Sequence, residues 1–254
     1  MKSISIYTLP LLLLLIFPAC TEEPTTVNDA VPDKLKSMIV LKEGETETFS
    51  FKYQDDFITE ISVIQSDGTR SSHKFFYDQG KLISKKVSTG EKSEIANFTY
   101  FDDEIIAYKF GTDSVIFVLD NDGNVNNSER FEYSNELQIL RPTGRKEYEW
   151  ADGNCTKITT LIYDDNLKTT VNYNYDTLQN PIKIYQGIPI PDDLIHDYEL
   201  ITSSENNVTS KTSGDYEVYY QYEYNENDFP SALTIKSFEV NLTDTTELLI
   251  TFEY

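Results

Sequence analysis

Hydrophobic and polar residues alternate in short runs from Glu45 to the end of the chain. In the segment 48–53, Phe49, Phe51 and Tyr53 fall on one face of a strand, and the polar residues between them fall on the other. The segment 216–224 repeats this pattern with Tyr and Val. A period of two with aromatic and β-branched residues is typical of β-strands, and no stretch keeps a helical period for three turns. The pattern predicts an all-β chain.

An internal repeat organises these runs. Its unit is aromatic-x-aromatic, a turn of two to four residues such as Gln79-Gly80 or Asp152-Gly153, and an apolar residue that opens the next strand. The clearest copies close one strand at Tyr53, Tyr77, Tyr100 and Trp150 and open the next at Ile58, Leu82, Ile105 and Cys155. The spacing predicts an antiparallel meander of about 16–18 short strands, each paired with its sequence neighbours. Cys155 then occupies an apolar position, which favours a small buried side chain over a reactive thiol.

Residues 1–19 have the pattern of a secretion signal. Lys2 gives a positive start, and Leu11–Phe17 is an apolar run too short to span a bilayer. The sequence Phe17-Pro18-Ala19-Cys20 resembles the lipobox of bacterial lipoproteins. In that family the cysteine carries diacylglycerol and an N-linked acyl chain such as palmitate. The resemblance implies that Cys20 is the lipid attachment site and that the protein is anchored to the outer membrane of the cell envelope by lipid alone.

We interpret residues 20–36 as the lipidated cysteine and a flexible, polar tether, and residues 37–254 as a single all-β domain. Glu22-Glu23, directly after Cys20, resembles the export signal of many surface lipoproteins of Bacteroidota. A solvated tether without an export role explains the same two residues equally well. The sequence therefore leaves the surface and periplasmic sides of the membrane open.

A second resemblance concerns the repeat itself. Tyr77-Asp-Gln-Gly-Lys-Leu82 resembles the YD repeat of Rhs-type proteins, Tyr-Asp-x-x-Gly-x-Leu, and the Tyr53 and Tyr100 copies are looser versions. Together with the lipobox, these units resemble an uncharacterised family of Bacteroidota lipoproteins with a porin-like fold. Lys52, Glu217 and Glu223 lie opposite the aromatic face, where a membrane-spanning strand would face lipid. We therefore expect a soluble, barrel-like sheet with its aromatic side inside.

The charge of the chain argues against nucleic acid as a partner, and the sequence contains no motif for a cofactor or metal. The formal charge is −22, with 43 acidic and 21 basic residues, so nucleic acid is not an expected partner. Neither His73 nor His196 lies in a metal-binding or triad motif, and no glycine-rich phosphate loop is present. We expect His73 to make cross-strand contacts. Asp120-Asn-Asp-Gly-Asn124 has its glycine in the wrong register for a calcium loop and fits a hairpin turn better.

The segment 186–197 is a Pro-rich insertion that interrupts the hairpin rhythm. Long loops on rigid β scaffolds often bind ligands, and a flap covering a barrel end is an equally good interpretation. The candidate binding residues are Gly187, Ile188, Asp192, Asp193 and His196. We expect a non-enzymatic envelope lipoprotein that binds an extracellular or envelope ligand, either glycan or protein. The alternatives are a structural or envelope-assembly component and, behind it, a glycan-active hydrolase.

Overall fold

The computed structural model describes residues 34–101, 105–110, 113–181, 204–239 and 246–254. The first eight strands are β1 (Ser37–Lys42), β2 (Glu45–Gln54), β3 (Phe57–Gln65), β4 (Arg70–Asp78), β5 (Lys81–Thr89), β6 (Lys92–Phe101), β7 (Ile105–Phe110) and β8 (Asp113–Leu119). The second eight are β9 (Val125–Ser134), β10 (Ile139–Ala151), β11 (Asn154–Ile162), β12 (Leu167–Gln179), β13 (Asn206–Ser213), β14 (Tyr216–Tyr224), β15 (Pro230–Glu239) and β16 (Thr246–Glu253). These residues contain no helix long and apolar enough to cross a membrane.

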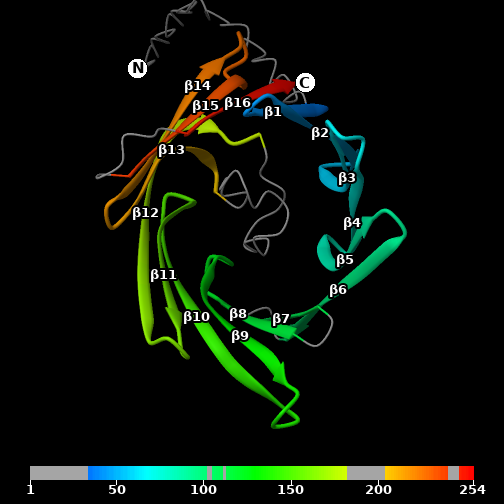
Figure 1. The fold of residues 1–254 in the computed structure, drawn as a ribbon, viewed down its shortest axis with the longest axis vertical. Helices are drawn as coiled ribbons and strands as arrows, with labels where there is room; N and C mark the ends of the chain where they lie inside the picture. The colour runs from blue at the N-terminus through cyan, green and yellow to red at the C-terminus, as the bar shows by residue number, and fades with distance from the viewer. Residues whose placement is uncertain (1–33, 102–104, 111–112, 182–203, 240–245) are drawn as a thin grey trace, which may run out of the picture. The chain divides into compact units, whose positions relative to one another are not determined.

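The strands form one antiparallel meander that closes into a barrel (Figure 1). Each strand pairs with its sequence neighbours, and β1 closes the ring by pairing with β16, where Ile39 lies opposite Thr251. The described part of the chain has 16 strands, which confirms the all-β, barrel-like meander predicted from the repeat. Lys34–Tyr254 is one compact unit.

Tight turns set the rhythm of the meander. Both residues of Gln79-Gly80 and of Asp152-Gly153 have positive φ angles, between 48° and 78°, as a two-residue hairpin with right-handed twist requires. The register shifts by one residue at the end of β2, between Lys52 and Tyr53, and again at the end of β4 and β10. These bulges place the closing aromatic of each strand at the barrel end and curve the sheet.

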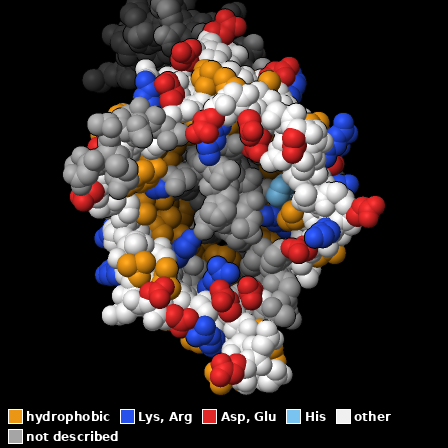
Figure 2. Space-filling model, viewed as in Figure 1, with side chains coloured by type: hydrophobic (Ala, Val, Ile, Leu, Met, Phe, Trp, Pro, Cys, Tyr) orange, Lys and Arg blue, Asp and Glu red, His pale blue; other side chains and the backbone are white. Residues whose placement is uncertain are grey.

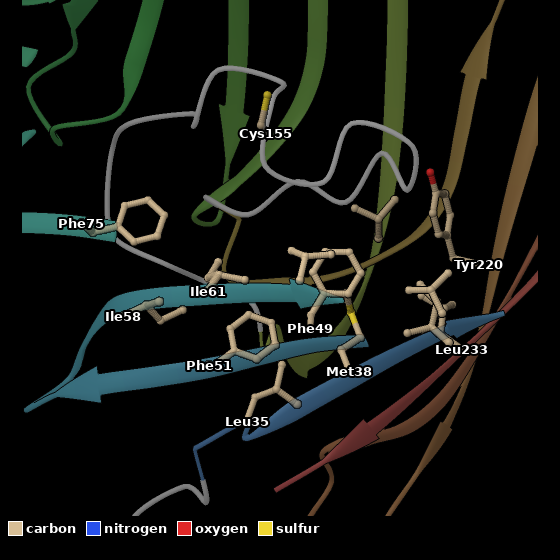
Figure 3. Packing of buried hydrophobic residues seen from close by; sticks show 14 of the residues in the cluster. Leu35, Met38, Phe49, Phe51, Ile58, Ile61, Phe75, Cys155, Tyr220 and Leu233 are labelled. Carbon is tan, nitrogen blue, oxygen red and sulfur yellow. The ribbon is translucent and has the colours of Figure 1, made fainter. Parts of the chain in front are cut away.

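The aromatic and aliphatic side of the strands faces the interior, as the alternation predicts. Met38, Ile61, Leu233 and Ile250 are at most 1% exposed, and Figure 3 shows such side chains directed inward from β1, β2, β3 and β15. Burying a side chain of this size contributes about 1.5–3 kcal/mol. Leu35, which the sequence pattern placed in the tether, is 2% exposed and belongs to the same core.

The outer wall carries polar and charged side chains. Cross-strand ion pairs join Lys52 Nζ to Glu60 Oε2 at 3.0 Å and Lys157 Nζ to Glu149 Oε1 at 2.7 Å. Acidic and basic side chains are scattered around the edge of the face shown in Figure 2. The expected separation of aromatic and charged residues holds only in part, because Phe76 and Tyr219 are exposed on the outer wall and Lys85 is buried.

All even-numbered strands end at the same end of the barrel. We call this end the tyrosine rim, because seven of the eight strands have an aromatic residue at or near their end there: Tyr53, Tyr77, Tyr100, Trp150, Tyr175, Tyr224 and Tyr254. β8 closes with Leu119 instead. The odd-numbered strands begin at this rim, and the long connection between β12 and β13 also leaves from it.

Candidate functional site

The site residues singled out in the sequence fall outside the described part of the chain. They are the lipid attachment residue Cys20 and the candidate binding-loop residues Gly187, Ile188, Asp192, Asp193 and His196. The structure does describe both flanks of that loop, at Asn180 and at Ser204. The candidate site can therefore be built from the residues that hold these flanks.

The two flanks lie side by side at the tyrosine rim. The backbone N–H of Asn180 donates to the carbonyl of Glu205 at 2.9 Å, and its side-chain amide donates to the carbonyl of Ser204 at 3.2 Å. Gln179 and Asn206 are partners in the β12–β13 register. The connection therefore starts and ends at neighbouring points on one sheet.

A reciprocal amide pair ties the returning chain to β11. The N–H of Asn206 donates to Asn154 Oδ1 at 2.9 Å, and Asn154 Nδ2 donates to Asn206 Oδ1 at 2.8 Å. The N–H of Glu205 also donates to the carbonyl of Gly153 at 3.2 Å. Gly153 has φ of +74°, and a Cβ there would lie 2.4 Å from Glu205 Cγ. Glycine suits this position, because it adopts the positive φ without strain and leaves room for the Glu205 side chain.

One carboxylate joins three strands next to this pair. Asp176 Oδ1 accepts the N–H of Leu178 at 2.9 Å and the N–H of Asn207 at 3.2 Å. Asp176 Oδ2 accepts Asn207 Nδ2 at 3.3 Å and the hydroxyl of Tyr224. Burial, followed by the bond to Asp176, raises the pKa of Tyr224 above its ordinary value, so the phenol stays protonated and donates. Charge-assisted bonds of this kind are about twice as strong as neutral ones.

A fourth link reaches Cys155 through a buried serine. Ser204, which is 0% exposed, donates through Oγ to the Tyr175 hydroxyl at 3.0 Å and accepts the N–H of Cys155 at 3.2 Å. The Tyr175 hydroxyl donates to the Cys155 carbonyl at 2.6 Å. The Cys155 side chain is buried, and burial raises the pKa of its thiol to about 12. This agrees with the structural role predicted for Cys155.

We call this group of side chains the rim network; its members are Asn154, Tyr175, Asp176, Asn180, Ser204, Asn206, Asn207 and Tyr224. The network connects β11, β12, β13 and β14 and holds both ends of the long connection. Tyr175 and Tyr224 follow the aromatic pattern of the strand ends, but sequence reasoning missed the network, because its partners lie between 17 and 52 positions apart. Chemically, the network fixes backbone positions with amides, hydroxyls and one carboxylate.

The segment 120–124, which the sequence analysis compared with a calcium loop, forms a turn. Asp120 Oδ1 accepts the N–H groups of Asp122 and Asn124, both at 2.9 Å, which confirms the turn interpretation of this segment. Within the described ranges, no group of three or more His, Cys, Asp or Glu side chains could hold a metal ion.

His73 faces the barrel interior from β4. It lies opposite Ile61 and Val87 in the sheet register, is 7% exposed, and its Nδ1 has no hydrogen-bond partner. Burial, and then the charge of Lys85, lower the pKa of His73 to about 4. The imidazole is therefore neutral near pH 7.

No family model matches the chain, and no curated protein matches it either. Solved structures similar to it include two that are described as porin-like proteins. The one from Bacteroides uniformis ATCC 8492 is 9% identical, with a TM-score of 0.40, and the match covers 86% of this chain and 96% of that one. The one from Bacteroides vulgatus ATCC 8482 is 13% identical, with a TM-score of 0.41, covering 87% and 98% respectively.

Proposed function

We propose that the protein is a non-catalytic binding module of the cell envelope, anchored to the outer membrane through lipid on Cys20. Its ligand or partner binds at the tyrosine rim, on the connection between β12 and β13. The observation that carries this proposal is the rim network, which fixes both ends of that connection to four strands.

A binding site that is ordered before the ligand arrives loses less entropy on binding. A loop that must be ordered on binding loses conformational entropy, and this loss weakens affinity. Asn180 and Ser204 are held at neighbouring positions before any ligand arrives, so part of this cost has already been met during folding. Binding loops on rigid β scaffolds follow the same principle.

Ile39, Ile64 and Phe76 are exposed on the outer wall, but its charged pairs support anchoring by lipid rather than by the strands. Lys52 and Lys157 face outward in ion pairs with Glu60 and Glu149. A Lys on a lipid-facing strand would cost about 2–4 kcal/mol at the middle of a bilayer. We therefore propose that the barrel lies in water and that acyl chains on Cys20 hold it at the membrane.

Anchoring is tested with the two cysteines of the chain, because one serves as the control for the other. Cells producing the wild type, Cys20→Ala or Cys155→Ala are labelled with radioactive palmitate and fractionated. The proposal predicts label and membrane association in the wild type and in Cys155→Ala, and neither in Cys20→Ala. Label retained on Cys20→Ala would refute it. Protease treatment of intact cells then separates surface exposure from the periplasm.

Binding is tested by thermal shift against a panel of glycans, peptides and Ca²⁺. Asp176→Asn removes the carboxylate of the rim network, whereas Asp120→Asn alters a carboxylate in a turn at the same rim and serves as the control. We expect a ligand that stabilises the wild type and Asp120→Asn, with a weaker shift for Asp176→Asn. If no panel member shifts the wild type while envelope proteins co-purify with it, the structural or assembly role is correct instead.

A further inference from the structure

Among the residues that the structure describes, the barrel has an open strand edge at the end opposite the tyrosine rim. β12 has 13 residues and β13 has 8. The β12–β13 pairing starts at Asn172, opposite Thr212, so Leu167–Val171 precede the first paired residue, and Ser213, the last residue of β13, falls beside Val171 in this register. On its other side this segment is paired with β11, from Leu167 opposite Ile162 to Val171 opposite Ile158. Figure 1 shows β12 continuing past the end of β13.

This edge is accessible and regular. Leu167, Lys168 and Thr169 are exposed, and Thr170 and Val171 are half-buried. The β11–β12 register has no shift along these residues, and the segment contains no proline. Bulges and prolines are the usual features that keep strand edges from pairing. Leu167–Thr170, which lie beyond the end of β13, offer about 14 Å of extended backbone with alternate N–H and C=O groups directed at the open side.

The two faces of the segment differ in chemistry. Leu167 and Val171 lie on the face of the sheet that lines the barrel interior further along, and Leu167 sits beside Ile162, with exposed fractions of 47% and 38%. Lys168 lies on the outer face, opposite Leu161. A strand beside this edge would meet apolar side chains on one face and a positive charge on the other.

We propose that Leu167–Val171 is a docking site for an extended segment of another protein, which adds a strand to the barrel beside β12. The added strand lies in line with β13 and continues the existing sheet, so its backbone hydrogen bonds have the geometry of the β12–β13 pair. Its side chains are apolar opposite Leu167 and Val171 and acidic opposite Lys168.

The occupant is a different protein rather than a second copy. Each copy carries a net charge of −22, so bringing two copies edge to edge is opposed by long-range repulsion. An extended segment of another protein brings only a few residues to the site, so its binding does not require two strongly negative barrels to approach each other. This site lies at the opposite barrel end from the rim network and does not depend on the function proposed for that rim.

The test selects a phage-displayed library of unstructured peptides on the purified protein. Enriched peptides are then titrated against the wild type, Thr169→Pro and Thr170→Pro. Neighbouring residues of an antiparallel strand direct their N–H groups to opposite sides, so one of these two residues donates toward the open edge. Proline at that position removes an edge donor and leaves the β11–β12 ladder intact. The melting temperature identifies it, because the other proline breaks a ladder bond.

We expect peptides with alternating apolar residues, bound about tenfold more weakly by the proline variant that keeps the wild-type melting temperature. Bound peptide should also slow amide hydrogen exchange in residues 167–171. Peptides that bind this variant as tightly as the wild type, or that protect another segment, would overturn the proposal, as would the absence of any enriched peptide. A dimer of the wild type in light scattering, lost in the same variant, would assign the edge to a second copy and also overturn it.

Discussion

The hydroxyl of Tyr77, at the end of β4, donates a hydrogen bond of 3.0 Å to the carbonyl of Ile58, at the start of β3. The same relation recurs at the tyrosine rim, with distances from 2.6 to 2.9 Å, for Tyr53 and Leu35, Tyr100 and Leu82, Trp150 and Val125, and Tyr175 and Cys155. The closing aromatic of an even-numbered strand thus binds the backbone at, or just before, the start of the preceding strand.

Replacing Tyr77 with Phe tests the contribution of one such bond. Burial raises the pKa of the Tyr77 hydroxyl above its ordinary value, so the group stays protonated and serves as a donor. Removing it leaves the Ile58 carbonyl without this donor, which should lower the free energy of unfolding by about 1–3 kcal/mol. Equilibrium unfolding in urea measures the change.

The matched control is Tyr219→Phe, because Tyr219 is 47% exposed on the outer wall and its hydroxyl binds Glu217. This substitution should change the free energy of unfolding by no more than about 0.5 kcal/mol. Equal effects of the two substitutions would contradict a specific role for the rim bonds.

The pH dependence of stability should include a contribution from His73. The folded protein binds a proton on His73 only near pH 4, whereas the unfolded chain does so near the ordinary pKa of 6.5. Between these values the unfolded state binds more protons, so stability falls as pH is lowered from 6.5 to 4. From pH 7 to pH 5 this contribution amounts to about 2 kcal/mol.

The measurement compares the wild type with His73→Gln, which has no titratable group at this position. Unfolding free energies at pH 7 and pH 5 give the pH sensitivity of each protein, and other titrating groups cancel in the comparison. We expect the wild type to lose about 2 kcal/mol more than the variant. An identical loss in both proteins would show that His73 is not buried in its neutral form.

The hydrogen bonds between Asn154 and Asn206 should stabilise the protein and hold the end of the β12–β13 connection in place. Asn154→Ala removes both partners of Asn206 in this pair and should destabilise the protein by about 1–3 kcal/mol. Because the pair holds the returning end of the β12–β13 connection, limited proteolysis within that connection should become faster. Asn172→Ala, an exposed position on β12, should change neither property. Unchanged proteolysis in Asn154→Ala would argue against the network as an anchor.

The hairpin rhythm could be predicted from the sequence because it is local. Phe49 and Phe51 alternate with polar residues, which predicts a strand, and the dipeptide Gln79-Gly80 predicts a turn. Both predictions need only neighbouring residues. The burial of Cys155 followed from its place in the repeat, in the position that Ile58 and Leu82 occupy. Closure of the barrel could not be predicted, because it depends on pairing between β1 and β16, at opposite ends of the domain.

The rim network and the open edge depend on contacts that the repeat does not encode. Asn154 and Asn206 form hydrogen bonds although they are 52 positions apart in the chain. Neither asparagine lies in a local motif that predicts this contact. The edge at Leu167–Val171 arises from the unequal lengths of β12 and β13, and strand ends are poorly defined by alternation alone. Both features therefore needed the three-dimensional register.

Closure of the barrel is the central claim, because the tyrosine rim forms a complete ring only when β1 pairs with β16. Its most direct test is a disulfide between Ile39→Cys on β1 and Thr251→Cys on β16, in a Cys20→Ala background. These positions are register partners on the outer wall, and paired residues lie about 4.5–5.5 Å apart at Cα, within the range of a disulfide. The control pairs Ile39→Cys with Glu247→Cys, four residues along β16 and about 14 Å away. Rapid intrachain oxidation of the first pair alone is the predicted result, whereas failure of that pair to oxidise in the folded protein would contradict the closed barrel.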